Sequence, residues 1–161
     1  MEGQEVLRAF VMLNVIVFLS LSGSGQKVAS EEVPVTVRQA FKDKFPAVKV
    51  AEWKLKSDKN YEAEFTLKGT EIAAKFDPAG KWLETESAIS HSKVLKAVRN
   101  LVAKQFQAYK VVETQSVQRW NEERLIYELH LENSKEIVKA QFSADGAILS
   151  QSTKLKSDKK K

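Results

Sequence analysis

The chain has 161 residues, contains no cysteine and has a formal net charge of +5. The lack of cysteine excludes disulfides, thiolate metal sites and thiol nucleophiles, so stability must come from packing. Five lysines and one aspartate lie in residues 154–161, so the excess of positive charge belongs mainly to this C-terminal segment. A tail of this composition is expected to be disordered, and the nearly neutral remainder argues against a nucleic-acid partner.

An apolar segment near the N-terminus predicts export. Residues 9–21 are mostly apolar and are followed by small residues at 22–25. The run is too short for a typical membrane span, and small residues after it are typical of a signal-peptide cleavage site. We therefore expect a signal peptide over 1–25 and no membrane span in the mature protein. The alternative is a buried or poorly ordered N-terminal helix, because two acidic residues outweigh the one arginine before the apolar run.

The rest of the chain contains an internal repeat. The segment VRQAFKDKF at 37–45 aligns with VRNLVAKQF at 98–106, and Tyr61-Glu62 aligns with Tyr127-Glu128. The offset between the copies changes from 61 to 66 along this alignment, so the second copy has gained five residues. The gain falls around the polar stretch 118–124, where we expect a longer hairpin loop because loops lengthen at little thermodynamic cost.

Each copy is expected to contain one helix followed by four strands. Apolar residues recur every three to four positions in the first part of each copy, which predicts an amphipathic helix. After each helix, apolar and polar residues alternate, as in YEAEFTL at 61–67, which predicts half-buried strands. The expected strands are 49–56, 61–67, 71–76 and 82–87 in the first copy, and 110–118, 125–132, 136–142 and 147–152 in the second. The predicted fold class is α+β, with two tandem units at 26–90 and 91–153, each one helix packed on a four-stranded antiparallel meander sheet.

No catalytic motif is present in the sequence. It lacks a glycine-rich phosphate loop, a Gly-x-Ser-x-Gly elbow, a His-Glu-x-x-His motif and an EF-hand loop. His91 lies between the two copies without a neighbour at metal-ligand spacing, so we interpret it as a linker or helix-entry residue. The sequence therefore predicts no enzyme activity, no cofactor and no metal site.

Four polar residues belong to the outward-facing set of two equivalent strands. Glu62 and Glu64 occupy this set in the first copy, and Glu128 and His130 occupy it in the second. Paired carboxylates could serve as acid and base or bind a cation. A solvated strand face is the favoured interpretation, because every half-buried strand needs an outward polar set.

The three tryptophans are candidates for packing or for contact with a partner. Trp53 lies on the apolar side of a strand and is expected in the core. Trp82 follows a turn, and Trp120 lies in the expected longer loop. If exposed, these two side chains are of the type that anchors protein interfaces. The alternative is ordinary packing under a loop.

Several motifs of the first copy resemble those of one protein family. They are Val33-Pro34 before the helix, Phe45-Pro46 at its end, Glu52-Trp53, YEAEF at 61–65 and FDPAGKWLE at 76–84. With them, the chain resembles the PepSY-like, beta-lactamase-inhibitor-like periplasmic proteins of Gram-negative bacteria, less closely in its second copy. The resemblance implies a tandem helix-plus-four-strand fold, a periplasmic location and a non-enzymatic role. The inhibitor that gives the fold its name clamps an enzyme with its concave sheet surface. That inhibitor is disulfide-bonded, so we do not carry beta-lactamase inhibition over to this cysteine-free chain.

The leading functional prediction is an exported periplasmic module, binding or inhibitor-like, that contacts another envelope protein through its open sheet face and loops. The candidate contact residues are Trp82, Trp120, Glu62, Glu64, Glu128 and His130. The alternative is a protein of the cell envelope that binds or senses a small ligand or cation with the outward acids. A weaker alternative is a hydrolase with dispersed catalytic residues. The sequence leaves the identity of the partner and the oligomeric state open.

Overall fold

The computed structural model describes residues 25–156. Apart from Gly25, the predicted signal peptide lies outside the described residues, as do residues 157–161 of the predicted tail. Within residues 25–156, no helix is long and apolar enough to cross a membrane.

The described chain forms one antiparallel sheet with a helix over each half. The strands are arranged in sequence order, so each one pairs with the strand before it and the strand after it. The helices are α1 (Val35–Lys44) and α2 (Lys96–Gln105), and a 3-10 turn precedes each, η1 (Ser30–Glu32) and η2 (His91–Lys93). The strands are β1 (Gln26–Val28), β2 (Glu52–Leu55), β3 (Tyr61–Leu67), β4 (Thr70–Phe76), β5 (Trp82–Ala88), β6 (Lys110–Arg119), β7 (Glu122–Glu132), β8 (Glu136–Ser143) and β9 (Ile148–Leu155).

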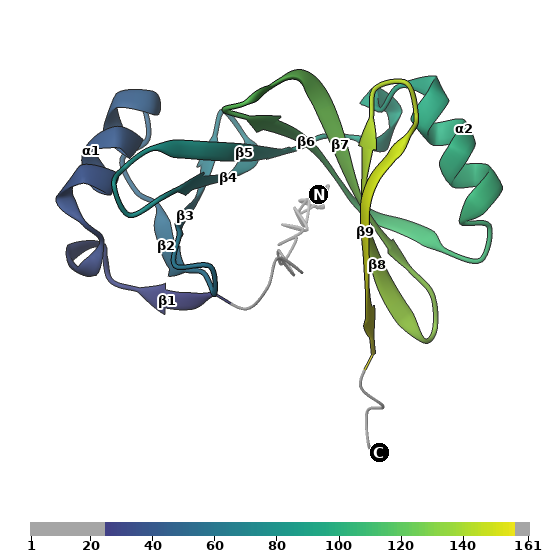
Figure 1. Cartoon of the computed structure of the whole chain (residues 1–161), viewed down its shortest axis with the longest axis horizontal. Coiled ribbons are helices and arrows are strands. Elements are labelled where there is room, and N and C mark those ends of the chain that lie inside the picture. The colour runs from purple at the N-terminus through teal and green to yellow at the C-terminus, as the bar shows by residue number, and fades with distance from the viewer. Residues whose placement is uncertain (1–24, 157–161) are drawn as a thin grey trace, which may run out of the picture.

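The sheet bends into an arch, and both helices lie on its outer side (Figure 1). The helix α1 covers the half formed by β1 to β5, and α2 covers the half formed by β6 to β9. Neither helix covers the inner side of the arch, which we call the concave face. The fold therefore presents one helix-bearing face and one open sheet face.

The two halves share one continuous sheet, which corrects the expectation of two four-stranded sheets. β5 pairs with β6 over five positions, from Glu84 opposite Arg119 to Ala88 opposite Gln115. β1 adds a ninth strand by pairing with β2. Joining the halves satisfies backbone groups that two separate sheets would leave exposed along their inner edges. The order of helix and four strands within each half agrees with the prediction.

The five residues gained by the second copy lengthen two strands rather than a loop. β6 and β7 contain 10 and 11 residues, whereas the equivalent strands β2 and β3 contain 4 and 7. Arg119 pairs with Glu122, so only Trp120 and Asn121 remain in the turn. The prediction of a longer loop was wrong because the backbone ladder continues through polar residues that the sequence pattern assigns to a loop.

The C-terminal end of the last strand overlaps the predicted lysine-rich tail. β9 runs to Leu155, so the first residues of that tail belong to the sheet. Lys156 then donates a hydrogen bond of 2.6 Å from its Nζ to the carbonyl oxygen of Asn133, and its Nζ lies 2.9 Å from a carboxylate oxygen of Glu132. The described part of the tail is therefore held against the β7–β8 connection.

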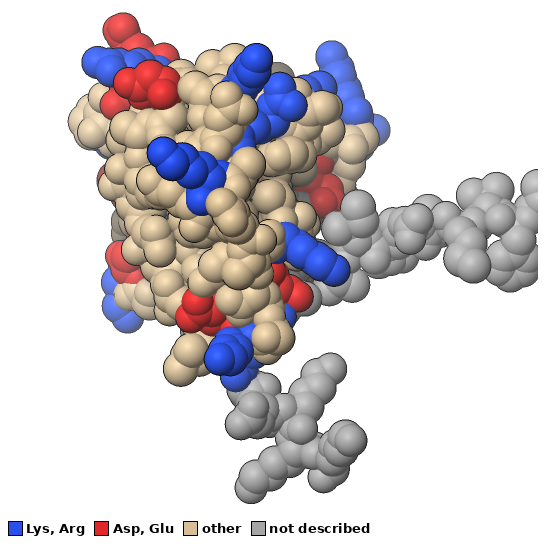
Figure 2. Space-filling model, turned by 90° about the vertical axis from the view of Figure 1, so that its right-hand side faces the viewer, with Lys and Arg blue, Asp and Glu red and all other residues tan. Residues whose placement is uncertain are grey.

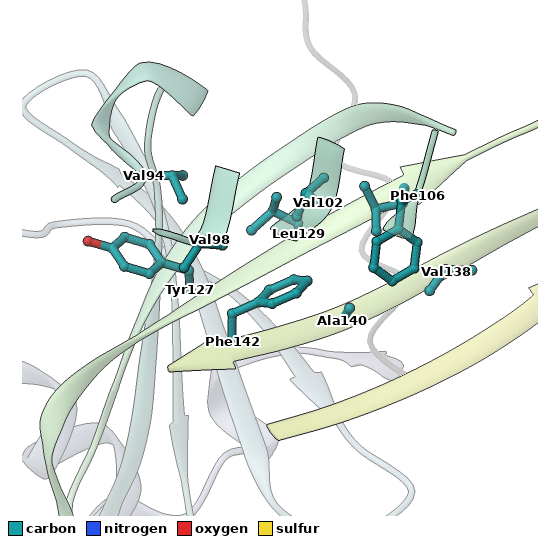
Figure 3. Close-up of a cluster of buried hydrophobic side chains, with 10 residues drawn as sticks. Val94, Val98, Val102, Phe106, Tyr127, Leu129, Val138, Ala140 and Phe142 are labelled. Atoms are coloured by element: carbon teal, nitrogen blue, oxygen red, sulfur yellow. The ribbon is translucent and has the colours of Figure 1, made fainter. Parts of the chain in front are cut away.

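Each helix packs on its half of the sheet through its own hydrophobic cluster. In the first cluster, the ring centroid of Phe41 on α1 lies 5.3 Å from those of Trp53 and Phe65. In the second cluster, Val98 of α2 packs with residues that include Leu129 of β7 (Figure 3). Trp53 is 4% exposed, which confirms its predicted place in the core. The alternation of apolar residues along the strands thus identifies the side that meets each helix.

Equivalent tight turns join the last two strands of each half. Gly80 and Gly146 have φ angles of +90° and +95°, a backbone region that favours glycine. The N–H of each glycine donates a 2.9 Å hydrogen bond to the carbonyl oxygen three residues earlier. A Cβ added to Gly80 would lie 2.7 Å from the carbonyl oxygen of Thr36, so the glycine also permits the turn to approach α1 closely.

Candidate functional site

The concave face gathers the polar side chains that alternate with the core residues. Phe65 of β3 belongs to the first core, so its neighbours Glu62 and Glu64 on the same strand face the opposite side. By the same alternation, Glu128 and His130 of β7 face the concave side in the second half. The one sheet therefore brings together polar residues that the sequence places in separate copies.

In the first half, two lysines pair with the two glutamates of β3. One lysine belongs to β2 and the other directly follows it. The Nζ of Lys54 lies 2.6 Å from a carboxylate oxygen of Glu64. The Nζ of Lys56 lies 3.1 Å from a carboxylate oxygen of Glu62, and both side chains are about nine-tenths buried or more. Both predicted outward glutamates of this half are thus ion-paired.

An arginine connects the two halves across the concave face. Glu84 of β5 accepts hydrogen bonds from the Nζ of Lys75 at 2.8 Å and from the Nε of Arg119 at 3.1 Å. A second nitrogen of the same guanidinium, Nη2, donates to the side-chain oxygen of Gln141 on β8 at 2.9 Å. Arg119 therefore links the last strand of the first half to the third strand of the second.

A lysine of β8 lies between two buried glutamates from different halves. The Nζ of Lys139 is 2.7 Å from a carboxylate oxygen of Glu128 and 3.9 Å from one of Glu86. Burial, followed by the charge of Glu128, raises the pKa of Glu86 to about 7, although the charge of Lys139 opposes this. The Glu86 carboxyl therefore changes its protonation within the neutral range.

The histidine of this face is doubly bound by carboxylates. The Nδ1 of His130 lies 2.6 Å from a carboxylate oxygen of Glu113, and its Nε2 lies 3.2 Å from one of Glu128. Burial opposes protonation, but hydrogen bonds with the two carboxylates outweigh it and raise the pKa of His130 to about 9. Burial likewise opposes ionisation of Glu128, yet hydrogen bonds from His130, with the charge and hydrogen bond of Lys139, lower its pKa to about 2. Both groups are charged at neutral pH.

Three of the four predicted outward residues are buried, which corrects the expectation of a solvated strand face. Glu62, Glu128 and His130 are 3%, 1% and 2% exposed, and Glu64 is half-buried. Sequence alternation gives the side to which they point but not the side chains that cover that side. Long lysine and arginine side chains from neighbouring strands pair with these carboxylates and help to bury them.

A groove of about 560 Å³ lies over this network and receives side chains from both halves. Its basic lining residues include Lys75, Arg119 and Lys139, whose side chains are 20%, 32% and 19% exposed. Their carboxylate partners lie deeper, with the Glu84 side chain 15% exposed and that of Glu128 fully buried. Two serines of β9, Ser150 and Ser152, also line the groove. The groove therefore presents these basic groups toward solvent above their carboxylate partners, together with one exposed acidic residue, Asp58.

The geometry does not favour the alternative hypothesis, in which the outward acids bind a cation. Each of Glu62, Glu64 and Glu128 already has a lysine within ion-pair distance. Within residues 25–156, no three acidic or histidine side chains are arranged to hold a metal ion. A cation would have to displace these lysines.

The two candidate contact tryptophans lie in different environments. Trp82 is half-buried against the first core, its indole N–H donates to the Thr85 hydroxyl at 2.9 Å, and the Nζ of Lys44 lies 3.6 Å from its ring centroid. Trp120 is 53% exposed at the turn between β6 and β7, with the Nζ of Lys81 3.1 Å from its ring centroid. Only Trp120 offers a large exposed aromatic surface.

The side of the molecule that carries the C-terminal half shows no extended patch of one charge. In Figure 2, basic and acidic side chains are scattered among uncharged ones on this side. All eight residues of β9 are exposed, and the first six carry no charge.

His91 begins η2 between the two halves and is exposed, which agrees with its interpretation as a linker residue.

Sequence reasoning missed the basic side chains of the concave face and the acidic residues of β5 with which they pair. Lys75, Glu84 and Glu86 lie in predicted strands, at positions that alternate with apolar or small residues. Arg119 and Lys139 could be associated with them only through the strand register and the pairing of β5 with β6. Opposite charges at alternating positions of adjacent strands were the available signal.

Comparison with known families agrees with this architecture. A family model described as "Putative beta-lactamase-inhibitor-like, PepSY-like" matches residues 20–72 and 59–150 of the chain. The chain belongs to this PepSY-like family. Together the two overlapping matches extend across both halves of the sheet. No curated protein matches the sequence of this PepSY-like chain.

Several solved structures have the same fold as this PepSY-like chain. A DUF2874 family protein from Bacteroides uniformis ATCC 8492 is 20% identical, with a TM-score of 0.67 over 74% of this chain and 88% of that one. A protein from Bacteroides eggerthii DSM 20697, described among "putative periplasmic proteins", is 22% identical, with a TM-score of 0.68 over 75% and 88%. A BLIP-like protein from Bacteroides fragilis NCTC 9343 is 22% identical, with a TM-score of 0.62 over 78% and 89%. At these identities the similarity establishes the fold alone.

Proposed function

We propose that this chain is an exported, non-enzymatic module that binds another protein of the cell envelope through its concave face. The observation that carries the proposal is the open groove of about 560 Å³, which both halves line with ionic side chains. Membership of a beta-lactamase-inhibitor-like family supports a binding role. The signal-like segment over 1–25 and the description of the Bacteroides eggerthii relative support an extracytoplasmic location.

The layering of charges in the groove favours a partner that presents an acidic segment. Lys75, Arg119 and Lys139 are partly exposed, whereas the carboxylates that hold them lie beneath. A partner carboxylate can therefore approach the exposed parts of Lys75 and Arg119 without displacing the buried acids. Charge-assisted hydrogen bonds of this kind provide both orientation and specificity.

The predicted contact residues then divide into a framework and a contact surface. Glu62, Glu128 and His130 are too buried to touch a partner, so their proposed role is to fix the basic side chains above them. Trp120 is the exposed aromatic residue that could add apolar contact area next to the junction of β5 and β6, because its backbone N–H donates to the carbonyl oxygen of Leu83 near the start of β5.

The proposal is tested by capture from an envelope extract with two matched arginine variants. Arg119→Gln removes a groove charge but keeps hydrogen-bonding ability, whereas Arg124→Gln removes an exposed charge outside the groove. Thermal melts first establish that both variants are folded. We expect one or more proteins to be retained by the wild type and by Arg124→Gln, lost with Arg119→Gln, and eluted by a hexaglutamate peptide.

The outcomes separate the binding face from the chemistry of the partner. Equal retention by wild type and Arg119→Gln, or the absence of any specifically retained protein, contradicts binding through the concave face. Loss with Arg119→Gln without elution by hexaglutamate leaves the face in place but refutes the acidic segment.

A further inference from the structure

A second pocket, on the helix-bearing side, combines basic groups with an aromatic wall. It has a volume of about 240 Å³ and lies between α1 and the segment that leads into β2. Its basic residues are Arg38 and Lys42 of α1 and Lys49 of the following segment. The lining contains no carboxylate, in contrast to the concave groove, whose lining includes Asp58, Glu84 and Glu86.

The basic groups of this pocket lack acidic partners in the described part of the chain. Among residues 25–156, no carboxylate lies within ion-pair distance of Arg38, Lys42 or Lys49. The Nε of Arg38 is moreover buried without a hydrogen-bond partner. Buried donors almost always have a hydrogen-bond acceptor, so this N–H would be satisfied by an acceptor on a bound ligand.

The arrangement of charges also favours an added anion. Arg38 and Lys42 are four residues apart on α1 and therefore lie on the same side of the helix, where like charges repel. Lys49 approaches the same pocket from the facing segment. A bound anion would relieve this repulsion and could accept hydrogen bonds from the planar guanidinium.

The rest of the wall is apolar and partly aromatic. Phe41 and Trp53, 6% and 4% exposed, belong to the first core and also line the pocket. Val48 and Val50 line it from the segment before β2, and Val50 is 82% exposed. A ligand that fits both parts of the wall has a charged head and an apolar body.

We propose that this pocket binds a small carboxylate that carries an apolar group, with the carboxylate held by Arg38, Lys42 and Lys49 and the apolar group against Phe41 and Trp53. Two sources share this chemistry, a short-chain fatty acid and the C-terminal residue of a peptide. The proposal concerns a face other than the concave groove and does not depend on the proposed protein partner.

The second copy of the repeat supplies a matched internal comparison. At the positions equivalent to Arg38, Lys42 and Trp53 it has Arg99, Ala103 and Thr114. It therefore retains the arginine but lacks the neighbouring lysine and the aromatic wall. Arg99→Gln is accordingly the control for Arg38→Gln, because both variants remove an arginine from the same position of a repeated helix.

The test is a titration of the full chain, monitored by two-dimensional amide NMR. Hexanoate represents the fatty acid, and N-acetyl-leucine represents the C-terminal residue of a peptide. Hexanol and hexylammonium serve as neutral and cationic controls. We expect at least one carboxylate to bind saturably, with a dissociation constant of about 1 mM or lower and with shifts centred on α1 and residues 48–53. Hexanol and hexylammonium are expected to bind at least tenfold more weakly.

The variants then decide which groups hold the carboxylate. Arg38→Gln is expected to weaken the carboxylate at least tenfold, whereas Arg99→Gln leaves its affinity unchanged. If Arg38→Gln fails to fold, the double variant Lys42→Gln/Lys49→Gln replaces it, because both lysines are exposed. No saturable shift with either carboxylate, equal affinity for hexanol, or unchanged affinity in the folded variant overturns the proposal.

Discussion

The most informative perturbation of the concave face is Glu86→Gln, which replaces the buried carboxyl by an uncharged group of the same shape. The Glu86 side chain is 10% exposed, and burial together with the charge of Glu128 raises its pKa from 4.5 to about 7. Glu84 and Glu62 add to this shift, and Lys139 opposes it. A shift of this size corresponds to about 3 kcal/mol of disfavour for the ionised form in the folded state.

The sign of the pH dependence follows from the raised pKa. Below about pH 4.5 the carboxyl is protonated in both states, so it does not disfavour folding. Between about pH 4.5 and 7 the unfolded chain ionises first, so the folded state binds more protons and the free energy of unfolding decreases as pH rises. Above this window the cost of ionising the buried carboxyl lowers the free energy of unfolding of the wild type in full. Glu86→Gln has no carboxyl at this position and avoids this cost.

Urea unfolding followed by circular dichroism, at pH 4.5 and at pH 8, measures this difference. We expect the difference in free energy of unfolding, Glu86→Gln minus wild type, to be about 2 to 3 kcal/mol larger at pH 8 than at pH 4.5, so that the variant gains relative stability. Any pH-independent effect of the substitution cancels in this comparison. Glu123→Gln, at an exposed position of β7, is the control and should give the same difference at both pH values. A relative stability of Glu86→Gln that does not change with pH, or that falls at pH 8, refutes the reasoning.

Three further predictions concern the stability of the fold. Glu128→Ala leaves two buried or half-buried cations without the carboxylate they share, and should lower the free energy of unfolding by about 3–5 kcal/mol in urea titrations at pH 7; a loss below 1 kcal/mol contradicts this. Gly80→Ala should destabilise by at least about 1 kcal/mol more than Gly69→Ala, because both have positive φ but only the first would bring a Cβ against α1; equal thermal melts would show that the close approach is unimportant. Leu129→Ala, fully buried, should cost about 2–5 kcal/mol, and Leu149→Ala, 51% exposed, well under half of that in the same titration; similar losses would place the second core elsewhere.

The sequence was sufficient to predict the local elements and the side of each strand that meets a helix. Alternation in YEAEFTL at 61–67 places Phe65 on the side that packs in the first core, and Leu129 of β7 lies in the second core. The turns at Gly80 and Gly146 also occupy equivalent positions of the two copies. These features depend on neighbours in the chain, which periodicity and turn chemistry describe.

The features that depend on contacts between distant strands could not be predicted in the same way. Burial of Glu128 and His130 requires Lys139 and other side chains to lie over them, and the strand register that places them there is not encoded in one strand alone. The joining of the two halves depends on the pairing of β5 with β6, which α2 separates in sequence. The basic surface of the groove was missed for this reason.

Site-specific photo-cross-linking in the cell tests the central claim, binding through the concave face, most directly. A photoreactive phenylalanine derivative is placed either at Ser152, which lines the groove, or at Thr153, the next residue of β9, which points to the opposite side. Both positions are exposed. The account predicts a discrete adduct with another envelope protein from position 152 and none from position 153. An equal or stronger adduct from position 153, or no adduct from position 152, would contradict it.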